Sequence, residues 1–125
     1  MSAAGLGDHV LIDLYGCAPE LLSDVPHVER TMTTAARAAG ATIVKAVFHA
    51  FNPVGVSGVV VITESHLAIH TWPEHAFASV DLFTCGASID AKAGIEVLRR
   101  GFRAERVTVK EVQRGELLDL AAQKV

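Results

Sequence analysis

One stretch of the sequence, residues 55–86, carries most of the side chains that could take part in chemistry. It combines hydroxyl, thiol, imidazole and carboxylate groups at short spacings: Ser57, Glu64, Ser65, His66, His70, Glu74, Asp81 and Cys85. Groups of these types can bind a metal ion, pair a nucleophile with a base, or process the chain that carries them. Each possibility makes a different demand on spacing.

A metal site is the first possibility, because the chain contains six histidines. His66 and His70 have the same parity on an extended strand, but four residues separate them by about 13 Å. A zinc ion holds its nitrogen ligands at about 2 Å. A regular strand cannot bring both imidazoles to one ion, so we expect no metal site.

A serine or cysteine hydrolase is the second possibility. Such enzymes hold the nucleophile on a sharp strand-to-helix turn, often in a GxSxG motif. The sequence has no such motif, and Ser65 lies between two predicted strands. The residue types fit a hydrolase, but their arrangement does not favour one.

Self-processing is the third possibility, with Ser65 as the residue that is consumed. A serine hydroxyl can attack the carbonyl of the residue before it, here Glu64, and replace the amide with an ester. β-Elimination then leaves dehydroalanine, which hydrolyses to a pyruvoyl group and ammonia. This chemistry needs a bend that exposes the carbonyl, a group that stabilises the oxyanion, and a base. Spacing alone does not establish it.

The local sequence adds stronger information. The run GVSGVVVITESHLAIHTWPE at 55–74, followed by DLFTCG at 81–86, closely resembles the small prokaryotic S-adenosylmethionine decarboxylases. A weaker likeness extends to the segment that begins at His9 and to 40–44, so it covers nearly the whole chain. The resemblance implies cleavage between Glu64 and Ser65, giving a β chain of residues 1–64 and an α chain of residues 65–125. It also implies a covalent pyruvoyl cofactor derived from Ser65, which forms a Schiff base with the substrate amine.

The same resemblance implies a role for other residues. His70 is the proton donor in processing, Ser57 assists processing, and Cys85 returns a proton to the substrate carbon after CO₂ leaves. Phe51 stacks on adenine, Glu74 holds the ribose hydroxyls, and Leu67 completes the expected substrate-binding set. The substrate is S-adenosylmethionine, and the product is the aminopropyl donor for spermidine synthesis.

The resemblance further implies a homodimer. On a regular strand Ser65 and Leu67 face one way, while His66 and His70 face the other, so His70 is poorly placed to serve the Ser65 of its own chain. In the family, one protomer supplies Ser57, His70, Phe51 and Glu74, and its partner supplies Ser65 and Cys85. We therefore expect two shared active sites per homodimer.

Two alternatives remain open at this stage. A pyruvoyl group reacts with any primary amine, so the same scaffold could decarboxylate ornithine or arginine. The chain could also be an unprocessed paralogue that regulates another decarboxylase.

The elements that must position these residues follow from hydrophobic patterning. Extended patterns span 9–15, 42–51, 55–63, 66–72, 76–85 and 106–112, and apolar residues recur at helical spacing over 26–39 and after Asp90 to about Gly101. Pro19 opens a further helical region, and the segment 117–125 is expected to be frayed or weakly helical. Consecutive strands without intervening helices favour antiparallel pairing. We expect an α+β fold: a two-layer sandwich, one mainly antiparallel sheet with helices packed on one face.

Length and composition limit the function classes. The chain has 125 residues and a formal net charge of −3, which predicts a single domain, 1–125, with no basic stripe for nucleic acid. No apolar run approaches the roughly 20 residues needed to span a bilayer. The first residues lack signal-peptide features, so we expect a cytoplasmic enzyme. The two cysteines, Cys17 and Cys85, form no disulfide or metal motif, and Cys17 suggests no role.

Overall fold

The computed structural model describes residues 5–85 and 88–117, so the expectation for 118–125 lies outside it. The elements in chain order are β1 (Gly5–Tyr15), α1 (Pro19–Leu22), α2 (Val25–Ala38), β2 (Ile43–Ala50), β3 (Val56–Ile62), β4 (Ser65–Trp72), the 3₁₀ turn η1 (Pro73–His75), β5 (Phe77–Thr84), α3 (Ala91–Gly101) and β6 (Arg106–Glu116).

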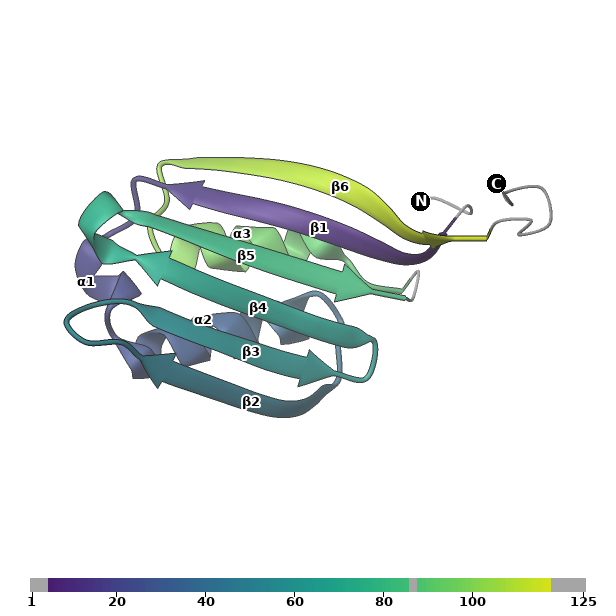
Figure 1. Ribbon diagram of the computed structural model, residues 1–125, viewed down its shortest axis with the longest axis horizontal. Coiled ribbons are helices and arrows are strands. Elements are labelled where there is room, and N and C mark those ends of the chain that lie inside the picture. Colours follow the sequence, from purple (N-terminus) through teal and green to yellow (C-terminus); the bar gives the residue numbers. More distant parts are fainter. Residues whose placement is uncertain (1–4, 86–87, 118–125) are drawn as a thin grey trace, which may run out of the picture.

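All six strands form one sheet in the order β2-β3-β4-β5-β1-β6, and every neighbouring pair is antiparallel. Helices α2 and α3 lie side by side behind the sheet in the view of Figure 1. The fold is therefore α+β with helices on one face, as the patterning predicted. Strands β1 and β6 are longer than expected because they pair with each other from Gly5 opposite Glu116 to Tyr15 opposite Arg106.

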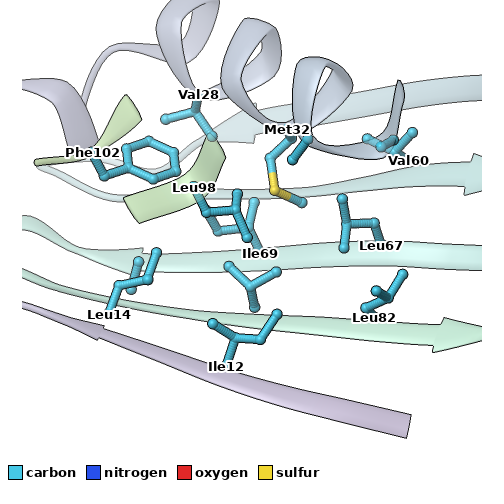
Figure 2. Packing of buried hydrophobic residues seen from close by; sticks show 14 of the residues in the cluster. Ile12, Leu14, Val28, Met32, Val60, Leu67, Ile69, Leu82, Leu98 and Phe102 are labelled. Carbon is cyan, nitrogen blue, oxygen red and sulfur yellow. The ribbon is translucent and has the colours of Figure 1, made fainter. Parts of the chain in front are cut away.

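The core lies between the sheet and the helices. Alternate residues of the strands point into it, among them Ile12, Leu67 and Ile69, and they pack against Met32 and Leu98 from the helices (Figure 2). Burial of this apolar surface is the main force that holds the two layers together.

The helices start where side chains can satisfy their free N–H groups. Asp24 accepts a hydrogen bond from the His27 N–H at the start of α2, and Asp90 accepts one from the Ala93 N–H at the start of α3. Both are N-caps of the kind that aspartate favours. The expectation that Asp90 begins the second long helix is confirmed.

Close contact between α2 and α3 depends on glycine. A Cβ added at Gly101 would lie 2.4 Å from Cγ2 of Thr31. We expect Gly101→Ala to destabilise the protein by about 1–3 kcal/mol through overpacking, despite the better helix propensity of alanine. Urea unfolding of the variant measures the loss. Adding Thr31→Ser removes Cγ2 and should restore most of it; a double variant as unstable as Gly101→Ala would contradict this explanation.

The other face of the sheet is not covered by any helix in the described part of the chain (Figure 1). Large apolar side chains on this open face are substantially exposed: Tyr15, Val47, Phe51, Val61 and Trp72. The antiparallel register places polar side chains in a row across the same face: His49, Ser57, His70, Ser79, Asp13 and Thr108. Ser57 and His70, which were singled out from the sequence, therefore lie on this open face.

Candidate active site

The β3–β4 turn forms the first of two clusters of polar groups. Thr63 and Glu64 connect the strands, and Cys85 directly follows β5, next to β4. The Cys85 backbone N–H donates to the Glu64 carbonyl at 3.2 Å, and the Cys85 thiol donates to the same oxygen at 3.4 Å. The carbonyl that precedes Ser65 is thus polarised by two donors from one residue, the arrangement that would stabilise an oxyanion there.

The backbone of Ser65 is strained. Its φ is +151°, a region that residues with a side chain rarely adopt. A strained backbone of this kind costs about 1–3 kcal/mol and is held by its surroundings. The strained residue directly follows the Glu64–Ser65 peptide bond, where the family resemblance implies cleavage.

Ser57 and His70 form the second cluster. They lie opposite each other on β3 and β4, and the Ser57 Oγ is 2.7 Å from Nδ1 of His70. The hydrogen bond leaves the Nε2 atom of His70 available to another group. Serine and histidine therefore form a pair that can hold and transfer a proton.

Phe51 and Glu74 lie near this second cluster. Phe51 follows β2 and is half exposed, and the ring of His49 packs against it edge-on at 4.7 Å between centroids. Glu74 lies in η1, directly after β4, and is exposed. An exposed aromatic face and a carboxylate at the same end of the sheet are groups that can recognise a nucleoside.

The structure does not bring the two clusters together within one chain. Ser65 begins β4, and His70 lies five residues along it, a separation of about 17 Å on a regular strand. The burial of Leu67 and Ile69 toward the helices, with His70 exposed on the other face, confirms the alternation expected from the sequence.

Leu67 does not belong to either cluster. It is only 3% exposed and packs in the core between sheet and helices. Its parity on β4 turns it away from the open face, so its side chain is not presented to a ligand there. The expectation that Leu67 contacts substrate has no support in this position.

The two cysteines differ in environment. Cys17 is buried, and burial raises the pKa of its thiol to about 11, so it stays protonated and inert at neutral pH. Cys85 is exposed and lies at the β3–β4 turn. Within the described residues no group of three or more potential metal ligands occurs. In the same residues no helix is long and apolar enough to cross a membrane.

Sequence reasoning missed two contacts of these clusters. His49 packs against Phe51, and its position two residues before Phe51 on an extended strand could have indicated this contact. Thr42 donates its backbone N–H to the Glu64 carboxylate at 3.3 Å. This contact could not be predicted from the pattern of side chains, because the donor is a backbone N–H group 22 residues away in the sequence.

Comparison with known proteins identifies the family. Residues 8–115 match the model of the S-adenosylmethionine decarboxylase family. The S-adenosylmethionine decarboxylase proenzyme of Carboxydothermus hydrogenoformans is 51% identical over 114 residues, covering 91% of this chain and 90% of the relative. The proenzyme of the same name from Thermotoga maritima is also 51% identical, over 110 residues that cover 88% of this chain and 85% of the relative.

A solved structure agrees with the sequence comparison. The crystal structure of the adenosylmethionine decarboxylase from Aquifex aeolicus superposes with a TM-score of 0.82 at 33% identity, covering 94% of this chain and 97% of that one. The sequence matches span most of both chains and the folds agree along nearly the whole length. The chain belongs to the S-adenosylmethionine decarboxylase family.

Proposed function

We propose that this chain is a proenzyme that cuts itself between Glu64 and Ser65 and then decarboxylates S-adenosylmethionine with a pyruvoyl group made from Ser65. The observation that carries the proposal is the pair of hydrogen bonds from Cys85 to the Glu64 carbonyl, next to the strained Ser65. Family membership and the names of the relatives support the reaction and the substrate.

The self-cleavage needs only groups of this chain and water. The Ser65 Oγ attacks the Glu64 carbonyl carbon while Cys85 stabilises the oxyanion; the C–N bond breaks and an ester replaces the amide. Removal of the Ser65 α-proton then expels the Glu64 carboxylate and leaves dehydroalanine at the new end. Water hydrolyses the tautomeric imine to a ketone and ammonia.

The cut leaves two fragments that share one sheet. Residues 1–64 contain β1, β2 and β3, and residues 65–125 contain β4, β5 and β6. The sheet order places β1 of the first fragment between β5 and β6 of the second, and β3 beside β4. We therefore infer that the fragments stay associated after cleavage, held by the same backbone hydrogen bonds and core.

The residues around Ser65 fit a pyruvoyl group at that position, because the turn lies at the end of two internal strands beside an exposed thiol. The group would supply a ketone that binds the substrate amine and an adjacent amide carbonyl that accepts the electron pair left by CO₂. Cys85 is the proton donor that we propose for the substrate carbon. His70 and Ser57 handle protons in processing, and their 2.7 Å contact supports this role.

Cys85→Ala separates the two roles of this residue. The backbone N–H of residue 85 remains, so the variant should still cleave, at a reduced rate. Loss of the general acid should lower kcat of the cleaved enzyme by about 10²-fold or more. Gel analysis and a ¹⁴CO₂ release assay measure the two effects, with Cys17→Ala as the control that should change neither proton transfer nor processing. A wild-type kcat in the Cys85→Ala variant would show that Cys85 is not the proton donor in catalysis.

We propose a homodimer formed by the open faces of two sheets. The exposed apolar residues on this face form a surface that a second copy can bury. A twofold axis that runs between the sheets and across the strands sets the Ser65 end of one protomer over the His70 end of the other. Two shared sites result.

Substrate assays test the function. The processed protein should release CO₂ from S-adenosylmethionine and not from ornithine or arginine, because Phe51 and Glu74 suit an adenine ring and ribose hydroxyls. Activity confined to ornithine or arginine would overturn the substrate assignment. A chain that stays intact and inactive would support the regulatory paralogue instead.

A further inference from the structure

We propose that the side chain of Glu64 is a positioning residue for self-cleavage: its carboxylate anchors the scissile turn to the backbone of Thr42. The inference rests on the proposed function and deepens it. Cleavage at Glu64–Ser65 assigns a role to the peptide bond, but it assigns none to the Glu64 carboxylate.

The anchor has defined contacts on the β2 side of the turn. Oε1 of Glu64 accepts the Thr42 N–H at 3.3 Å, and the Thr63 N–H donates to the Thr42 carbonyl at 2.9 Å. Burial acts to raise the pKa of Glu64, but the hydrogen bonds from Thr42 and Thr63 outweigh it, and the pKa lies below its ordinary value. The bonds therefore favour the ionised acceptor.

The other side of the same residue is held by Cys85, whose N–H and thiol both donate to the Glu64 carbonyl. Glu64 is thus fixed through its carboxylate toward β2 and through its carbonyl toward β5. With both groups fixed, the peptide plane between Glu64 and Ser65 has little freedom to rotate. The hydrogen bonds on both sides of Glu64 account for how Ser65 keeps a φ of +151°.

The sequence of the turn explains why an anchor is needed. Two-residue hairpin turns usually place Gly, Asn or Asp where φ is positive, and this turn is formed by Thr63 and Glu64. The unfavourable φ falls on Ser65. Without the carboxylate anchor, rotation about the flanking bonds can relieve the strain and turn the carbonyl carbon away from the Ser65 hydroxyl. Small displacements of reacting groups are costly in rate.

Three variants of Glu64 test whether cleavage depends on the position of the carboxylate oxygen or on its charge. Glu64→Gln keeps the length of the side chain and an acceptor oxygen, so it should cleave at close to the wild-type rate. Glu64→Asp keeps the charge but falls short by one methylene, and Glu64→Ala removes the acceptor; both should cleave about tenfold more slowly or worse. Glu111→Ala, an exposed glutamate on β6, is the matched control and should cleave normally.

The step that slows can be identified chemically. Hydroxylamine cuts esters but leaves amides intact, so it reveals whether a precursor has passed the N-to-O shift. The uncut Glu64→Ala precursor should resist hydroxylamine, because the anchor acts before the ester forms. The inference would be overturned if Glu64→Asp were cleaved quickly and Glu64→Gln slowly, or if all three variants were cleaved at the wild-type rate. A Glu64→Ala precursor that is cut by hydroxylamine would also overturn it. If wild-type protein itself is not cleaved, the proposed function fails instead.

Discussion

Ser65→Ala should remain a single chain and release no CO₂ from S-adenosylmethionine, whereas wild-type protein should separate into two fragments under denaturing conditions. The substitution removes the only atom that can attack the Glu64 carbonyl from the adjacent residue, so neither the ester nor the ketone can form. The polarised carbonyl and the Cys85 donors remain, which makes the hydroxyl the single missing group. Denaturing gel electrophoresis and activity assays of freshly purified and aged protein measure the effect.

Ser23→Ala is the matched control for this experiment. Its hydroxyl bonds only the Pro19 carbonyl among the described residues, in the segment between α1 and α2. It should cleave and turn over like wild type. A Ser65→Ala protein that still splits at residue 64 would show that another group attacks the bond, and the proposed route to the pyruvoyl group would be wrong.

Mixed dimers should restore cleavage between two inactive variants. In the proposed arrangement, a dimer of Ser65→Ala with His70→Ala places the Ser65 of the second chain at the intact His70 of the first. That site is complete, and the His70→Ala chain should be cut while the Ser65→Ala chain stays whole. The physical reason is the separation of about 17 Å between Ser65 and His70 along one strand. Differently tagged, co-expressed chains allow the mixed dimer to be purified and each chain to be followed by mass.

The complementary pairing is the control. When Ser65→Ala and His70→Ala are combined in one chain and paired with wild type, the wild-type Ser65 faces a partner that lacks His70. The wild-type chain of that dimer should remain uncut. If each protomer instead carried its own complete site, the wild-type chain would be cut in this dimer and neither chain would be cut in the first one. The two dimers therefore give opposite results under the two arrangements.

Local sequence signals predicted most of the fold. The alternating strands and the Asp90 cap appear where expected, because hydrophobic periodicity and helix capping act over a few residues. Strand length was less predictable. The extra residues of β1 and β6 are ordered by pairing with each other across about a hundred positions of sequence, and neither strand shows this in its own pattern.

The candidate site, like the fold, could be predicted only in part from the sequence. The family resemblance indicated Ser57, His70 and Cys85, and the structure sets Ser57 against His70. Leu67 was assigned to substrate by resemblance, although its inward parity on β4 places it in the core. The Thr42–Glu64 contact arises from tertiary packing, so side-chain patterning contains no information about it.

Intact mass measurement of purified wild-type protein, before and after borohydride reduction, tests the central claim most directly. The proposed function predicts two fragments, residues 1–64 and 65–125, and a second fragment whose terminal ketone gains two hydrogens on reduction. A single chain of 13.2 kDa, or a second fragment that begins with an unmodified serine amine, would contradict it.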